Sequence, residues 1–229
     1  KKTMSNINAA KLIIENIQLI EQMRNLLEGE LGEKFFNAVD AVIKQSVESF
    51  DEKMIAGYNF CEEADTWFFS PKWKVGEARN PQSAQEWKNV YALYRLSNES
   101  ANDEENNYYL TDFLENDVDR MVFNFEIWKH NINKMSAKEW KEFVAKINQD
   151  YPQLEQLGFK FNPEGNWYLP IASLDKQAVI KNYENDTLED ALTPITEALE
   201  KVKQAHPYFD QIVQAAIVKF GRIEAEETV

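Results

Sequence analysis

The chain has 229 residues, of which 44% are hydrophobic and 13% aromatic, with 7 Gly and 7 Pro. This composition excludes disordered and fibrous proteins, and the length is enough to bury a sizeable core. Because 39 Asp and Glu outnumber 25 Lys and Arg, the net charge is −14, and the resulting field opposes approach to phosphate backbones and anionic lipid. We therefore expect no direct nucleic-acid binding and no membrane association.

Cys61 is the single cysteine, so the chain forms no internal disulfide, and we expect a reducing, cytoplasmic compartment. The apolar stretch Leu12–Ile20 contains Glu15, Asn16 and Gln18, which a signal peptide core or a membrane span would not tolerate.

Two helical periods open the chain. Apolar residues recur at Ala10, Ile13, Ile17, Ile20 and Leu27, and a second series runs Leu31, Phe35, Val39, Val42, Val47 and Phe50. Gly29 and Gly32 separate them, which is compatible with a helical hairpin or with one bent helix. We favour the hairpin.

The middle of the chain has strand character. Residues 67–73, 90–96 and 108–114 read as strands, and in 121–127 the residues Met121, Phe123, Phe125 and Ile127 alternate with more polar ones. Their connections are too short for helical crossovers, so we predict an antiparallel meander of three to four strands.

Helices return towards the C-terminus. Ser136 and Glu139 match a capping box, Asp175 and Thr187 are candidate caps, and Pro194 suits the first turn of a helix through Ala205. We expect that helix to end at His206-Pro207, with a last helix following. The turn 162–165 precedes residues 167–174, which we predict as an edge strand because of Pro170.

The fold class is therefore α+β: an N-terminal helical hairpin, a central antiparallel meander and a mostly helical C-terminal part. We predict one domain over residues 1–229, with a possible subdivision into 1–55, 56–133 and 134–229.

The most distinctive feature is an acidic tract between Leu96 and Arg120 that contains no Lys or Arg. Its carboxylates are Glu99, Asp103, Glu104, Glu105, Asp112, Glu115, Asp117 and Asp119. Tyr108, Tyr109 and Phe113 lie among them, so the tract resembles a folded surface that attracts cations more than a disordered tail.

No motif for nucleotide, metal or cofactor binding stands out. His130 and His206 have no metal-ligand partner at helical spacing, so we expect no metal and no cofactor. A Mg²⁺-dependent nuclease needs carboxylates and a lysine, and Asp65, Glu86 and Lys88 are the best candidates. The Glu-x-Lys pattern is, however, expected by chance in a chain this rich in both residues. Two carboxylates for glycoside chemistry also remain possible, since nothing in their spacing selects a pair.

The leading hypothesis is a non-enzymatic acidic binding protein that neutralises a basic, nucleic-acid-handling partner, as a nucleic-acid mimic, immunity protein or antitoxin does. The tract would supply charge, and Trp67, Trp73, Tyr108 and Tyr109 would supply aromatic anchors. The alternatives are the nuclease and a structural α+β module whose charge serves only solubility.

Overall fold

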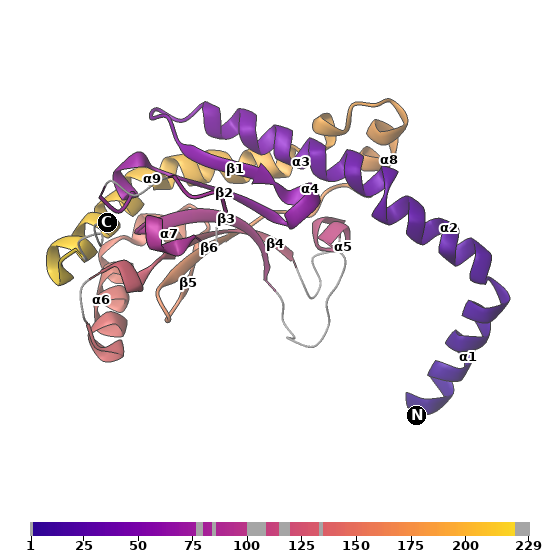
Figure 1. Ribbon diagram of the computed structural model, residues 1–229, viewed down its shortest axis with the longest axis horizontal. Coiled ribbons are helices and arrows are strands. Elements are labelled where there is room, and N and C mark those ends of the chain that lie inside the picture. The colour runs from indigo at the N-terminus through magenta and orange to yellow at the C-terminus, as the bar shows by residue number, and fades with distance from the viewer. Residues whose placement is uncertain are drawn as a thin grey trace, which may run out of the picture.

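The computed structural model describes residues 2–76, 80–83, 86–99, 109–114, 120–132 and 135–222, with the backbone alone at residues 2–6 and at Trp87. The chain is α+β, as predicted (Figure 1). The helices are α1 (Lys2–Glu15), α2 (Ile17–Glu28), α3 (Glu30–Glu48), α4 (Phe60–Glu63), α5 (Tyr109–Leu114), α6 (Ala137–Asp150), α7 (Pro152–Gln156), α8 (Lys176–Glu184) and α9 (Thr193–Phe220). Short 3-10 turns span Pro71–Trp73, Trp87–Asn89, Lys129–Asn131 and Leu188–Ala191.

One antiparallel sheet contains all the strands that the structure describes. They are β1 (Ile55–Asn59), β2 (Asp65–Phe69), β3 (Ala92–Glu99), β4 (Arg120–Ile127), β5 (Lys160–Asn162) and β6 (Asn166–Pro170). Their order is β1-β2-β3-β4-β6-β5, so the predicted meander is present but has more strands than expected. The predicted edge position of the 167–174 strand is wrong, because β5 turns back at residues 163–165 and pairs with the outer side of β6.

The sheet packs one face against two helices. In β4 the side chains of Met121, Phe123, Phe125 and Ile127 are all buried, whereas Asn124 and Glu126 are half-buried, as the predicted alternation requires. Val122 departs from this alternation, because it is buried on the other face. Helices α3 and α9 lie together along this face (Figure 1). Phe209 of α9 stacks on Phe125 with ring centroids 4.0 Å apart. A continuous cluster of buried side chains joins α3, the sheet and α9.

The predicted break at His206-Pro207 is wrong, because α9 runs unbroken through Pro207. Proline inside a helix removes one backbone hydrogen bond and costs roughly 3 kcal/mol. Here Ala205 and Phe209, on either side of it, are fully buried. His206 is also held by Tyr94 Oη at 3.0 Å and by Glu52 Oε1 at 2.8 Å. Packing of one long helix across the sheet therefore outweighs the local preference for a break.

The N-terminal region is a bent helix and not the favoured hairpin. Backbone hydrogen bonds from Gly29 to Asn25 and from Glu33 to Gly29 carry the helical path across the junction of α2 and α3. Gly29 has φ of −108°, so it does not adopt the left-handed conformation that typically ends a helix before a reversal. As a result α1 and α2 project from the body as an arm (Figure 1).

Residues 108–114 are predicted as a strand, but the described part of this segment is helix α5. Tyr109 and Phe113 both contact the ring of Phe60, as two side chains four residues apart on a helix can do. The capping box at Ser136 and the cap at Asp175 are confirmed, since both side chains accept the expected backbone hydrogen bonds. Thr187 precedes a 3-10 turn and makes no such bond.

The packing of α9 on the sheet predicts the effect of shortening Phe209. Phe209→Ala should lower the free energy of unfolding by about 3–5 kcal/mol, because it removes a fully buried ring and leaves a cavity. Val218→Ala is the matched control on the same helix, since that side chain is 84% exposed, and it should change stability by less than about 0.5 kcal/mol. Urea unfolding followed by circular dichroism measures both, and equal effects would contradict the assigned packing.

Candidate functional site

The nuclease candidates lie in separate local settings. Asp65 begins β2 and is almost fully buried, with its Oδ1 3.5 Å from a guanidinium nitrogen of Arg95 on β3. Glu86 accepts a hydrogen bond of 3.1 Å from Asn89, and Lys88 is exposed in the same 3-10 turn. Among the residues that the structure describes, no group of three or more His, Cys, Asp or Glu side chains is arranged to hold a metal ion.

The two tryptophans proposed as partner anchors are core residues. Trp67 is 2% exposed and stacks with Phe69, while its ring lies close over Gly57. Trp73 is fully buried, and its indole N–H donates to Asp210 at 2.9 Å. In this conformation neither ring is exposed to a partner.

The structure describes three of the proposed residues in the acidic tract. Glu99 accepts a 2.7 Å hydrogen bond from Arg120, Asp112 is 1% exposed with its Oδ2 3.4 Å from the Asn98 amide, and Tyr109 is half-buried against Phe60. These side chains are engaged within the fold. The remaining proposed residues lie outside the described part of the chain: Asp103, Glu104, Glu105, Tyr108, Glu115, Asp117 and Asp119.

The face of the sheet opposite α9 carries a row of polar side chains. Strand register places Arg95 opposite Asn124, Asn124 opposite Tyr168 and Tyr168 opposite Lys160, so these residues share one face. Glu126 is also on this face, two residues along β4 from Asn124. We call this surface the open face. It brings strands far apart in sequence into one polar surface.

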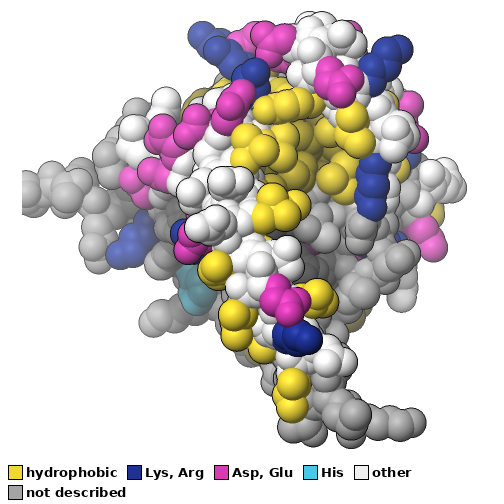
Figure 2. Space-filling view, turned by 90° about the vertical axis from the view of Figure 1, so that its right-hand side faces the viewer, with side chains coloured by type: hydrophobic (Ala, Val, Ile, Leu, Met, Phe, Trp, Pro, Cys, Tyr) yellow, Lys and Arg dark blue, Asp and Glu magenta, His cyan; other side chains and the backbone are white. Residues whose placement is uncertain are grey.

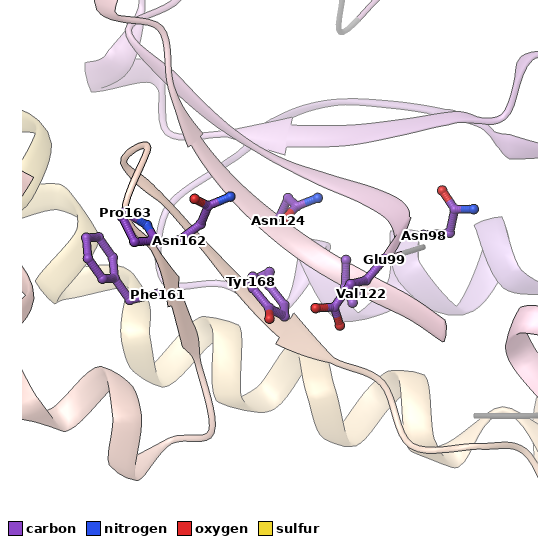
Figure 3. A pocket seen from close by; sticks show the side chains of 8 residues that line it. All are labelled: Asn98, Glu99, Val122, Asn124, Phe161, Asn162, Pro163 and Tyr168. Atoms are coloured by element: carbon purple, nitrogen blue, oxygen red, sulfur yellow. The ribbon is translucent and has the colours of Figure 1, made fainter. Parts of the chain in front are cut away.

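A hollow of about 360 Å³ lies on the open face (Figure 3). Its walls come from β3, β4, β5 and β6 and from the turn between β5 and β6. The lining residues are Asn98, Glu99, Val122, Asn124, Phe161, Asn162, Pro163 and Tyr168. The carboxamides and the phenol can donate and accept hydrogen bonds and the carboxylate can accept them, so the hollow suits a polar group.

Two carboxyl groups of the open face, those of Glu99 and Glu126, have opposite electrostatic settings. Burial raises the pKa of Glu126, and the nearby charge of Arg95 opposes this only in part. Burial also acts to raise the pKa of Glu99, but hydrogen bonds from Tyr168 and Arg120 more than offset it, so that pKa is lowered. Glu99 is therefore held as the anion, and charge on Glu126 is disfavoured.

A second concentration of carboxylates lies around the start of α3, where sequence reasoning missed it. Lys34 Nζ is 3.8 Å from Glu30 and 3.4 Å from Asp186, which brings the end of α8 beside α3. Helix α4 and the 3-10 turn 188–191 also contact α3. We define the acidic surface as these eight exposed residues: Glu30, Glu33, Glu62, Glu63, Glu184, Asp186, Glu189 and Asp190.

The pKa of the Cys61 thiol reflects the negative charge of this surface. Burial raises the pKa of its thiol, and the carboxylates of Glu33, Asp40 and Glu62 raise it further. Lys34 and Lys181 are cations in the same region. Figure 2, which looks onto this side of the molecule, shows Asp and Glu side chains beside a hollow lined by hydrophobic ones. One part of the acidic surface could have been found from the sequence, because residues 182–200 contain six acids and no Lys or Arg.

Comparisons of the chain with models of protein families, with curated proteins and with solved structures find no significant match. In the ranges that the structure describes, no helix combines the length and the apolar character needed to cross a bilayer.

The setting of Glu126 predicts a pH effect on stability. Its pKa is higher in the folded than in the unfolded chain, so its contribution to stability is fully present below the unfolded pKa of about 4.3 and is lost as pH rises through the folded pKa. Glu126→Gln stays neutral and avoids this loss. The free energy of unfolding of the variant relative to the parent should therefore rise between about pH 4 and pH 7.

Urea unfolding at a series of pH values measures this difference. Glu142→Gln, at an exposed position on α6, is the control for the change in net charge. A difference between Glu126→Gln and the parent that stays constant with pH would show that Glu126 ionises equally in both states.

Proposed function

We propose that the chain is a non-enzymatic acidic binding protein whose partner is basic. The observation that carries this proposal is the acidic surface, where three segments distant in sequence bring together eight exposed carboxylates. A net charge of −14 spread evenly would serve solubility. Carboxylates gathered on one surface create a local field that can orient an approaching cation.

The physical basis of such binding is long-range attraction followed by short-range packing. Steering by complementary charge raises association rates about 10- to 1,000-fold at low ionic strength. The attraction falls off over a Debye length of about 8 Å at physiological salt, so it is sensitive to salt. The same field repels phosphate, which favours a basic protein over nucleic acid as the partner.

Apolar contact area is available next to the charge. Ile180 on α8 is 51% exposed, and Tyr183 on the same helix is half-buried under the ammonium of Lys34 at 5.4 Å. These side chains take the anchoring role first assigned to Trp67 and Trp73. Exposed apolar groups ringed by charge are typical of the centre of a binding surface.

The kind of basic partner decides what binding by this chain would achieve. A nucleic-acid-handling enzyme or a cationic toxin would present the required charge, and occupation of its basic groove would inhibit it. This makes the chain an inhibitor of the nucleic-acid-mimic, immunity or antitoxin type, acting in the cytoplasm. The single cysteine and the excess of acids support this finer proposal.

Charge reversal on the acidic surface tests the proposal. The double variant Glu189→Lys with Asp190→Lys should slow association with poly-L-lysine about tenfold at low salt, because it reverses the local field. Glu142→Lys with Glu155→Lys changes the net charge equally, at exposed positions on α6 and α7, and should slow association much less. Stopped-flow fluorescence over a salt series measures the rates.

Capture from cell extract then addresses the natural partner. The parent chain should retain basic proteins at low salt and release them as salt rises, and the 189/190 variant should retain fewer of them than the 142/155 variant. If the two double variants behave alike in both measurements, only net charge matters, and the acidic surface is ordinary solvated surface.

A further inference from the structure

Exposed apolar side chains are concentrated on the N-terminal arm. Among the described residues, eleven large hydrophobic side chains are prominently exposed, and all but Ile180 and Val218 lie on α1 and α2. The nine on the arm are Ile7, Leu12, Ile13, Ile14, Ile17, Leu19, Ile20, Met23 and Leu26, with exposures of 37% to 74%. Figure 2 shows hydrophobic side chains following the arm away from the body. Scattered exposed apolar groups are normal on a soluble protein, but a continuous set marks an interaction surface.

Among the residues that the structure describes, none fully buries a side chain of the arm. Helix α2 has no buried residue, and every side chain described in α1 is exposed. Isolated helices shorter than about 12–15 residues are marginal in water, because most helical stability in proteins comes from packing of an apolar face. Helices α1 and α2 have 14 and 12 residues. The arm therefore needs a partner to bury its apolar face.

The apolar seam of the arm continues directly into the core of the body. Ile13, Ile17, Ile20 and Leu27 recur at helical spacing, and the series passes through half-buried Leu31 to fully buried Phe35. Within the body the seam lies on α3 and is covered by neighbouring elements, since Phe35 packs against Phe113 of α5 and α3 contacts α9 and β1. On the arm, Ile13, Ile17 and Ile20 of this seam are 48%, 46% and 37% exposed, so the partner must extend the packing that begins at Leu31.

We propose that the partner is a second copy of this chain, and that two arms pack side by side to form a homodimer. The charge distribution favours this occupant. Residues 1–28 contain Lys1, Lys2, Lys11 and Arg24 against Glu15, Glu21 and Glu28, so the arm carries +1 while the remaining chain carries −15. Two arms can meet without repulsion, whereas two bodies cannot. With so little positive charge, the arm also has weak attraction for anionic lipid.

The available surface is of the right size for a dimer. Seven of the nine side chains, all but Ile7 and Ile14, lie on the seam side of the arm. They offer on the order of 50 Å² each, or roughly 700 Å² of apolar surface for two arms. Polar side chains beside the seam add to this area, towards the about 1,200 Å² at which specific interfaces begin. The interface is isologous, since each copy contributes the same surface.

The two arms run in opposite directions. In a parallel pair the acidic bodies would lie at the same end, and Arg24, which falls in the seam between Ile20 and Leu27, would face its own copy. In an antiparallel pair the bodies lie at opposite ends. The arm bends between α1 and α2 (Figure 1), but α2 alone, with 12 residues, spans about 18 Å, which exceeds the Debye length of about 8 Å at physiological salt.

The mass of the full chain in solution tests the dimer. Sedimentation equilibrium should give twice the chain mass of 26.7 kDa, and the dimer should persist at high salt because apolar contacts hold it. Ile13→Glu with Ile20→Glu should reduce the mass to that of one chain. Gln18→Glu with Gln22→Glu adds the same charge on the opposite, polar side of the arm and should leave the dimer intact.

Circular dichroism and urea unfolding check that both double variants still fold. Neither should change the stability of the body, since neither pair of positions contacts the core. A parent chain that is monomeric overturns the proposal, whether or not it binds vesicles of phosphatidylcholine and phosphatidylglycerol. A dimer that survives Ile13→Glu with Ile20→Glu also overturns it, because the contact then lies elsewhere.

The direction of the arms has its own test. In a chain carrying Cys61→Ser, Leu27→Cys should form no disulfide between copies under mild oxidation, because antiparallel arms keep the two positions apart. A rapid and complete disulfide between copies would overturn the antiparallel arrangement.

Discussion

The stack of Phe209 on Phe125 joins helix α9 to the middle of the sheet. Phe125 lies in the middle of the sheet and also contacts Trp73, Tyr94 and Trp167. Helix α9 crosses this aromatic cluster and buries one face of the sheet. The polar side chains Arg95, Asn124 and Tyr168 lie on the other face and form the open face.

Buried polar contacts determine where the covering helices sit. Asp40 of α3 accepts hydrogen bonds from the Phe60 backbone at 2.8 Å and from the Thr66 hydroxyl. Burial raises its pKa even though these bonds act in the opposite direction. His206 of α9 bridges Tyr94 and Glu52. Buried hydrogen-bonded groups add little net stability, but misplacing them is costly, so they specify one position for each helix.

Features that depend on local chemistry could be predicted from the sequence. The alternation in β4 and the Ser136–Glu139 capping box depend on neighbours within a few residues, and both are present. For Pro207 and residues 109–114 the sequence pattern predicts the wrong conformation, because contacts with distant residues, including Phe125 and Phe60, decide it. Tertiary packing overrides local preference in both places.

The candidate surfaces were harder to predict for the same reason. The acidic surface is assembled from α3, α4 and residues 184–190, and only the last of these is a run of acids in the sequence. The aromatic residues Trp67 and Trp73 looked suitable as anchors because a single sequence does not show which strand face is buried. Composition indicated the sign of the charge, and topology decides where it gathers.

The arm and the acidic surface are adjacent, which links the two proposals physically. Glu30 and Glu33 stand in the first turn of α3, directly after the arm ends at Glu28. A dimer through the arms would present two acidic surfaces on one particle. A basic partner with two sites would then bind the second surface at a high effective concentration and gain affinity without any new contact. Salt would separate the two contributions, since screening weakens attraction between charges and leaves apolar packing between arms in place.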